Sequence, residues 1–127
     1  MLVSLQLPAQ PAKSAAAYQR FIPRNEMDIA VAGAASWVQL DESGEKIEAA
    51  RIALAAIDPT PVIAEAAVDF LSGQPATAET FEKAGELARQ AARPIDDMRG
   101  TTEYRVHLAG VLTKRTLAIA VERARAR

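Results

Sequence analysis

Few side chains in this 127-residue chain have the chemistry that catalysis or metal binding requires. The single histidine, His107, has no second histidine and no cysteine with which to complete a metal site or a nucleophile–base pair. Asp96 and Asp97 are adjacent carboxylates, which can in principle bind a divalent cation or share a proton. Adjacent side chains usually point apart, however, and Arg93 and Arg99 flank the pair. We therefore interpret His107 as structural or exposed, and the aspartates as an arginine-paired or solvated loop that caps the following helix.

The segment 32–36 is the nearest approach to a phosphate-binding loop. Its sequence, AGAAS, has one glycine and no lysine, and it falls where we expect a strand and not a strand-to-helix turn. We therefore assign it to core packing, because small residues let another layer approach closely.

The chain ends in an arginine-rich tail that includes Arg123, Arg125 and Arg127. Such a tail can indicate RNA binding, but the whole chain is slightly acidic, with a formal charge of −1. Cations in the last turn of a helix also complement the helix dipole. We interpret the tail as a helix-end charge bias on a solvated face.

Composition argues against several other classes of function. Without cysteine, this chain forms no disulfide and supplies no thiolate to zinc or to an iron–sulfur cluster. Its net charge gives no overall attraction to phosphate groups, so we expect neither nucleic acid nor membrane as a partner. No apolar run approaches the roughly 20 residues that span a bilayer. The N-terminus lacks the basic start of a signal peptide, and we expect a cytoplasmic protein.

A sheet must position the first half of these residues. Half of the chain is hydrophobic, which is enough for one domain over residues 1–127. Alternating polarity and bounding prolines predict four extended segments, which are Leu2–Leu7, Tyr18–Ile22, Ile29–Leu40 and Ile47–Ile57. The turn at 41–44 makes the last two a hairpin, although their alanine content makes helix the alternative.

Helical spacing replaces alternation beyond residue 59. Thr60 as N-cap and Pro61 at the first position predict a helix that ends at Gly73. Thr77 begins a second helix, and a third begins near Thr101. The expected buried residues of these last two helices are Phe81, Ala84, Ala88 and Ala91, and then Tyr104, Leu108, Val111, Leu112, Ala118 and Ile119.

The order of these elements predicts the fold class. Strands that follow strands pair antiparallel and leave one sheet face for helices to cover. We therefore expect an α+β sandwich, in which a small antiparallel sheet of three or four strands is followed by three helices.

Two segments resemble a known family. The first is Tyr18–Ala30, with the sequence YQRFIPRNEMDIA; the second is Ala92–Gly100, with the sequence ARPIDDMRG, which leads into Glu103-Tyr104-Arg105 and Leu108. Between them lies AIDPTPV at 56–62. In this order they resemble the C-terminal domain of the FAD-binding medium subunit of aerobic-type carbon monoxide dehydrogenases and xanthine dehydrogenases, which are molybdenum hydroxylases. The α+β fold that this resemblance implies agrees with the fold expected from periodicity.

The resemblance implies a part in electron transfer. In the complete enzyme, a molybdopterin-binding large subunit oxidises the substrate, an iron–sulfur small subunit relays the electrons, and FAD on the medium subunit accepts them. This domain would help to cover the flavin and dock the subunits. The glycine-rich FAD-binding motifs of the two preceding domains are absent from this sequence. We therefore expect no tight FAD binding by this chain alone.

The resemblance also implies the site residues. In flavin domains of the xanthine dehydrogenase type, a basic residue at the position of Arg20 lies near the isoalloxazine ring, where a cation would stabilise the negative charge gained on reduction. Arg20 is therefore the predicted cofactor-binding residue, and an exposed strand arginine is the alternative. No residue is predicted to be catalytic or to bind a metal. The predicted interface residues are Phe21, Ile22, Arg24, Met27, Asp28, Asp97 and Arg99.

These interface residues have different expected roles. Asp97 and Arg99 are expected to lock their loop by charge-assisted hydrogen bonds, and Arg24 and Asp28 to form an ion pair or an interdomain contact. The apolar members, together with Ile95 and Met98, are expected to form an exposed patch, which would make an isolated chain self-associate.

A second hypothesis has a different functional class. The chain could be a stand-alone, non-catalytic interaction module that kept the fold without the redox role. The missing FAD-binding motifs favour this alternative, and coding sequence for FAD-binding domains upstream would favour the first hypothesis.

Overall fold

A four-stranded antiparallel sheet forms one layer of the molecule. The computed structural model describes residues 1–24 and 27–127. Its strands are β1 (Ser14–Phe21), β2 (Ala32–Leu40), β3 (Ile47–Ala55) and β4 (Val62–Ile63), in the spatial order β1-β2-β3-β4. All neighbours are antiparallel, so the hairpin predicted across residues 41–44 is confirmed and its helical alternative is not.

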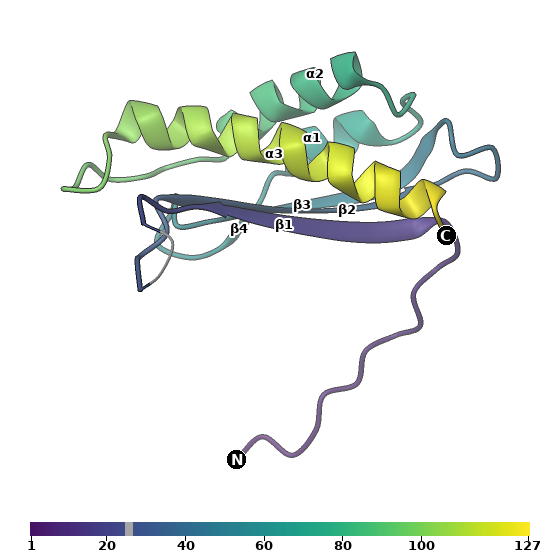
Figure 1. The fold of residues 1–127 in the computed structure, drawn as a ribbon, viewed down its shortest axis with the longest axis horizontal. Coiled ribbons are helices and arrows are strands. Elements are labelled where there is room, and N and C mark those ends of the chain that lie inside the picture. The colour runs from purple at the N-terminus through teal and green to yellow at the C-terminus, as the bar shows by residue number, and fades with distance from the viewer. Residues whose placement is uncertain (25–26) are drawn as a thin grey trace.

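Three helices form the second layer on one face of this sheet (Figure 1). They are α1 (Glu65–Leu71), α2 (Ala78–Arg89) and α3 (Thr102–Arg125). The predicted caps of the last two are confirmed, because the Thr77 hydroxyl accepts the Thr80 N–H and the Thr101 hydroxyl accepts the Tyr104 N–H. None of the helices in the described part of the chain combines the length and the hydrophobicity needed to span a bilayer. The predicted α+β sandwich is confirmed.

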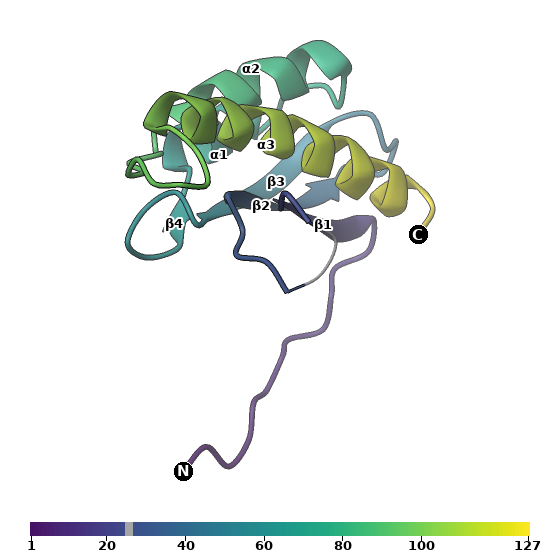
Figure 2. The same cartoon turned by 60° about the vertical axis from the view of Figure 1, so that its left-hand side comes forward.

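One predicted strand is wrong, and another was missed. The segment Leu2–Leu7 is exposed, has no regular structure and extends away from the sheet (Figures 1 and 2). The fourth strand is instead β4, whose residues pair with Ala53 and Leu54 and so cannot form the first turn of a helix. The helix predicted from Thr60 and Pro61 accordingly begins only at Glu65, without a side-chain cap.

The core lies between the layers. Large apolar side chains on the helix-facing side of the sheet, such as Val38, Ile52 and Leu54, are fully buried, as is Leu117 of α3. The Ser36 and Thr116 hydroxyls form a hydrogen bond of 2.7 Å across this interface, which satisfies two buried polar groups.

The buried stripe of α3 differs from the prediction. Leu108 and Leu112 are buried as expected, but Tyr104 and Ala118 are exposed. The helix also buries small and polar residues that a search for large apolar side chains passes over, namely Arg105, Ala109, Gly110, Thr113, Thr116 and Ala120. Small side chains let α3 lie near the alanine-rich strands.

The other face of the sheet carries no helix (Figure 2). We call it the uncovered sheet face. Tyr18, Arg20 and Arg51 are exposed there and Trp37 is half-buried, whereas its centre holds small residues. Arg20 stands opposite Gly33, and Tyr18 opposite Ala35, which pairs in turn with Ala53.

Candidate functional site

The two signature segments meet at one end of the molecule. The β1–β2 connection (22–31), the β3–β4 connection (56–61) and the α2–α3 connection (90–101) all lie at the left-hand end in Figure 1. Residues 25 and 26 of the first signature lie outside the described residues. Segments separated by up to about 80 positions in the sequence thus form one surface, which we call the loop end.

Arg105, in the first turns of α3, ties these connections together. Its side chain is only 6% exposed. Its Nη1 donates to the Val31 carbonyl oxygen at 2.8 Å and to the Ala56 carbonyl oxygen at 3.2 Å, and its Nη2 donates to Oδ1 of Asp97 at 2.5 Å. One planar guanidinium group therefore satisfies acceptors from all three connections.

Asp97 closes a tight turn in the α2–α3 connection. Asp97 and Gly100 exchange backbone hydrogen bonds of 3.2 Å, and the Arg99 N–H donates to Oδ1 of Asp97 at 2.8 Å. The Arg99 guanidinium lies 3.8 Å from Oδ2. The backbone N–H of Arg99, followed by the hydrogen bond from Arg105, holds the pKa of the Asp97 carboxyl below its usual value.

Asp96 has a different partner from Asp97. It accepts the backbone N–H of Thr102 and so adds to the cap at the start of α3. The two adjacent carboxylates therefore point to separate partners. Among the described residues, no group of three or more histidine, cysteine or acidic side chains could hold a metal ion.

A cleft of about 430 Å³ opens between the three connections. Its walls include Ile29, Pro59, Pro94 and Ile95, and Asp97 and Arg105 lie at its polar side. Asp58 and Arg93 also line it. The Nη1 of Arg93 is engaged by the carbonyl oxygens of Gln90 and Ala92. The cleft is therefore apolar with charged margins.

The β1–β2 connection is held by local contacts at its base. The exposed Arg24 and the largely buried Asp28 side chain form an ion pair of 3.5 Å, and Asp28 also accepts the N–H groups of Arg24 and Ile29. The side chain of Phe21 turns inward and meets the Tyr104 ring edge-on, with centroids 5.9 Å apart. Met27, in contrast, is 97% exposed and has a positive φ of 49°.

Arg20 lies on the uncovered sheet face, near the end of β1 that leads to the loop end. Its side chain is exposed, and no carboxylate in the described part of the chain forms an ion pair with it. Its cross-strand neighbour is Gly33, and the Tyr18 ring lies over that glycine, because a Cβ atom added there would stand 3.1 Å from the Tyr18 hydroxyl oxygen.

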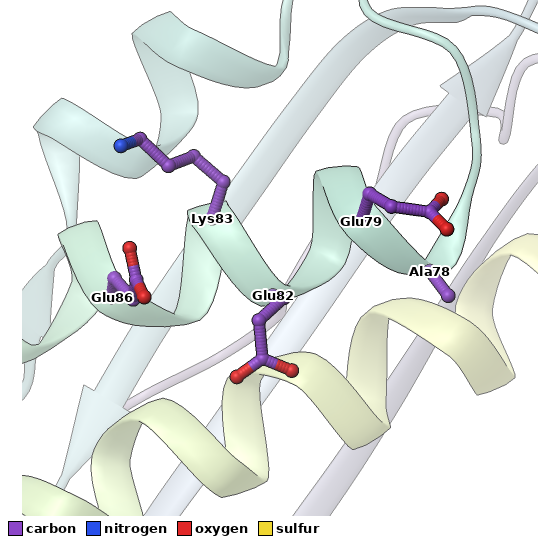
Figure 3. Close-up of a pocket in the computed structure, with 5 residues that line it drawn as sticks. All are labelled: Ala78, Glu79, Glu82, Lys83 and Glu86. Carbon is purple, nitrogen blue, oxygen red and sulfur yellow. The ribbon is translucent and has the colours of Figure 1, made fainter.

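A second hollow, on the outer surface of α2, has the character of a solvated helix face. It is lined by Ala78, Glu79, Glu82, Lys83 and Glu86, whose side chains leave the helix in different directions and do not converge (Figure 3). Glu82 is paired with Lys114 of α3, which lowers the pKa of the Glu82 carboxyl. His107 is also exposed, on α3. We assign no chemistry to these residues.

The structure brings some of the predicted site residues together and not others. Asp97 and Arg99 share one turn, and Arg24 and Asp28 share another. Arg20 points to a different surface from Phe21, since neighbouring strand residues face opposite sides. Ile95 and Met98 are 72% and 91% exposed at the loop end, together with Met27.

Sequence reasoning missed the residue that organises this site. Arg105 belongs to the second signature, but no structural or functional role was predicted for it. The signal was a cation at a helix position next to apolar residues, three after Thr102 and three before Leu108. The lining residues Asp58 and Arg93 gave no such signal.

Comparison with known proteins agrees with this architecture. A family model described as the CO dehydrogenase flavoprotein C-terminal domain matches residues 16–120. The carbon monoxide dehydrogenase medium chain of Afipia carboxidovorans is 38% identical over 127 residues, which is all of this chain and 42% of that protein. A putative xanthine dehydrogenase FAD-binding subunit of Escherichia coli is 30% identical over 122 residues, which is 95% of this chain and 41% of that protein.

Solved structures give the same result. The Cu,Mo-CO dehydrogenase in its cyanide-inactivated form matches with a TM-score of 0.83 and 32% identity, over 92% of this chain and 40% of the other. Quinoline 2-oxidoreductase from Pseudomonas putida matches with a TM-score of 0.81 and 31% identity, over 87% of this chain and 38% of the other. The chain thus spans about two fifths of the length of these relatives. It belongs to the CO dehydrogenase flavoprotein C-terminal domain family, as its two signature segments predicted.

Proposed function

We propose that this chain serves as the C-terminal part of the flavoprotein subunit of a carbon monoxide dehydrogenase-like molybdenum hydroxylase, where it helps to cover FAD and to dock the other subunits. Electrons would reach that flavin from a molybdopterin-binding large subunit through an iron–sulfur small subunit. The observation that carries the proposal is the family match over residues 16–120, combined with an unpaired cation on an uncovered sheet face.

The residues of this chain suit one side of a flavin and not a whole FAD site. Arg20 offers an exposed positive charge on the uncovered sheet face, next to the Tyr18 ring, which lies over Gly33. No glycine-rich phosphate-binding turn occurs in the sequence, so the dinucleotide phosphates would be bound elsewhere. When bound, the flavin supplies the redox chemistry, and this chain contributes charge and shielding from water.

The loop end supports a docking role. Met27, Ile95 and Met98 expose apolar side chains beside a cleft with charged margins, which is a surface typical of interfaces. We propose that the predicted interface residues act in two ways. Met27, Ile22, Arg24 and Arg99 would contact partners, while Phe21, Asp28 and Asp97 would hold the connections in shape through their internal contacts.

The charge of Arg20 provides the test of the flavin-covering role. In a complete flavoprotein subunit that contains this chain, we expect Arg20→Gln to lower the flavin midpoint potential by about 20 to 40 mV, because the cation favours the negative charge gained on reduction. Arg51→Gln is the matched control, since Arg51 is exposed on the same face but is displaced along the strands by four residues, about 13 Å.

The two variants separate the possible outcomes. A lower potential in Arg20→Gln alone, with normal FAD content, supports the proposal. Equal potentials in both variants and in the unchanged protein would remove Arg20 from the flavin site. Spectroelectrochemical titration gives the potential directly and does not depend on turnover at molybdenum.

The alternative, a stand-alone interaction module, draws support from the same exposed loop end. It makes a different prediction, because such a module would bind its partner without any flavoprotein segment attached. Pull-down of separately purified molybdenum and iron–sulfur subunits by this chain alone would favour it. Assembly that requires the FAD-binding segments would favour the proposed function.

A further inference from the structure

The C-terminal arginines are bound to the protein backbone and do not form a merely solvated charge bias. Nε of Arg125 donates to the Gly44 carbonyl oxygen at 2.9 Å. Nη1 of Arg123 donates to the Ala16 carbonyl oxygen at 2.8 Å. Nη1 of Arg127 donates to Oε1 of Gln10 at 2.5 Å and makes a longer bond of 3.4 Å to the Ser14 carbonyl oxygen. Two of the three arginines therefore reach strand β1, about 110 positions away in the sequence.

The acceptors of these bonds lie on the free edge of the sheet. β1 is the first strand in the order β1-β2-β3-β4, so one of its sides has no neighbouring strand. The carbonyls of Lys13 and Phe21 accept N–H groups from Leu40 and Val31, on the β2 side. Because strand residues alternate in direction, Ser14, Ala16, Tyr18 and Arg20 point their backbone groups outward.

The arginines cover only half of this edge. Arg123 and Arg127 occupy the carbonyls of Ser14 and Ala16, and no hydrogen bond from another described residue reaches the outward carbonyls of Tyr18 and Arg20. The strand has three consecutive alanines, one charge and no proline, so its side chains offer little obstacle to a further strand. The opposite edge strand, β4, has only two residues.

A second copy of the chain fits this edge best. An antiparallel β1 from another copy presents outward groups at the same alternate positions, so the same surface is complementary to itself about a twofold axis. The small alanine side chains match one another in such a pairing. The guanidinium groups at Ser14 and Ala16 stand in its way, since both copies carry the same positive charge there.

We propose that the free edge of β1 is a latent pairing surface for the β1 strand of a second copy, and that Arg123 and Arg127 close it by occupying its outward carbonyls. In this proposal, the C-terminal arginines prevent the addition of another strand to β1. This role is independent of the flavin and of the loop end.

The test removes the two arginine side chains that occupy the edge carbonyls. We expect Arg123→Ala/Arg127→Ala to associate at least about tenfold more tightly than the unchanged chain in a sedimentation concentration series. Amide exchange at Ala16 and Tyr18 should slow as concentration rises, because a new ladder forms there. Arg115→Ala is the matched control, since Arg115 is exposed on the same helix. It should associate as the unchanged chain does.

A rescue variant separates edge pairing from partial unfolding and from association through the loop end. Ala16 is exposed, and Ala16→Lys puts a charge on the edge strand, which opposes pairing. Added to the double variant, it should return association to the level of the unchanged chain. Unaltered association in the double variant, or tighter association that Ala16→Lys leaves in place, would overturn the proposal.

Discussion

Among the described side chains of the loop end, Arg105 donates the most hydrogen bonds, and we expect their loss to lower the stability of the fold. Arg105→Met keeps an apolar stem but leaves the Val31 and Ala56 carbonyls and the Asp97 carboxylate without their donor. We expect the free energy of unfolding to fall by about 3 to 5 kcal/mol, as for other buried pairs that lose one partner. Urea denaturation followed by circular dichroism measures this change.

Two further variants test whether the stabilisation by Arg105 comes from the geometry of its guanidinium group or from its charge alone. Arg105→Lys keeps the charge, but one ammonium group cannot reach all three acceptors, so its stability should lie between those of the other two proteins. Arg115→Met, an exposed change on the same helix, should stay within about 0.5 kcal/mol of the unchanged chain. Arg105→Met as stable as Arg115→Met would contradict the role assigned to Arg105.

Asp97 should make the loop end sensitive to acid. Its pKa is lowered in the folded chain, first by the Arg99 N–H and then by Arg105, relative to an ordinary value of 3.8. A lowered pKa means that the folded state favours the ionised carboxylate, so the stabilisation is fully present above the unfolded value. It is lost as the pH falls from about 5 through 3.8 and then through the folded pKa.

The matched measurement compares Asp97→Asn with the unchanged chain across that range. The stability gap between them should be widest near pH 6 and should narrow as the pH falls below about 4. Asp69→Asn, on an exposed part of α1, should show no such convergence. A gap that stays constant from pH 6 to pH 3 would show that the Asp97 charge does not contribute.

At the scale of elements, local signals located the helices better than the strands. Thr77 and Thr101 mark helix starts through chemistry within three residues, so sequence alone predicted them. A strand forms only where a neighbouring strand accepts and donates its backbone hydrogen bonds. The alternating segment Leu2–Leu7 has no such neighbour, whereas Val62–Ile63 pairs with β3. The candidate site was likewise predictable only where its signals are local in the sequence. Its two segments were evident from resemblance, but their junction at Arg105 depends on contacts 49 and 74 positions apart.

The packing of α2 on α3 depends on two glycines that sequence patterns did not identify. A Cβ atom added at Gly85 would lie 2.8 Å from the Gly110 carbonyl oxygen, which is backbone and cannot turn away. Gly85→Ala should therefore push the helices apart and lower the free energy of unfolding by about 1 to 3 kcal/mol, in spite of the better helix propensity of alanine. Thermal and urea denaturation measure the change.

The neighbouring position provides the control. Glu86 is exposed on the same helix, and Glu86→Ala changes a side chain without entering the interface, so its stability should change by no more than about 0.5 kcal/mol. Gly85→Ala more stable than the unchanged chain would mean that the helices separate easily and that the close approach is not required.

At the scale of the whole molecule, the two faces of the sheet differ, because only one of them is covered by helices. All three helices lie on one sheet face, while the other face and the loop end expose Arg20, Met27, Ile95 and Met98. The chain spans about two fifths of its relatives' length, and under the proposed function these exposed surfaces would meet the remaining segments and subunits. The uncovered sheet face and the loop end are the surfaces that the proposed function uses.

The same division predicts how the chain behaves toward FAD. An isolated chain of residues 1–127 should bind FAD weakly or not at all, because it offers one open face and a cleft of about 430 Å³ but no phosphate-binding turn to enclose the dinucleotide. Titration followed by flavin fluorescence should show no saturable quenching in the micromolar range. Joining the chain to the FAD-binding segments of a related medium subunit should restore stoichiometric binding. Tight, stoichiometric quenching by the isolated chain would mean that the uncovered face is itself a complete flavin site.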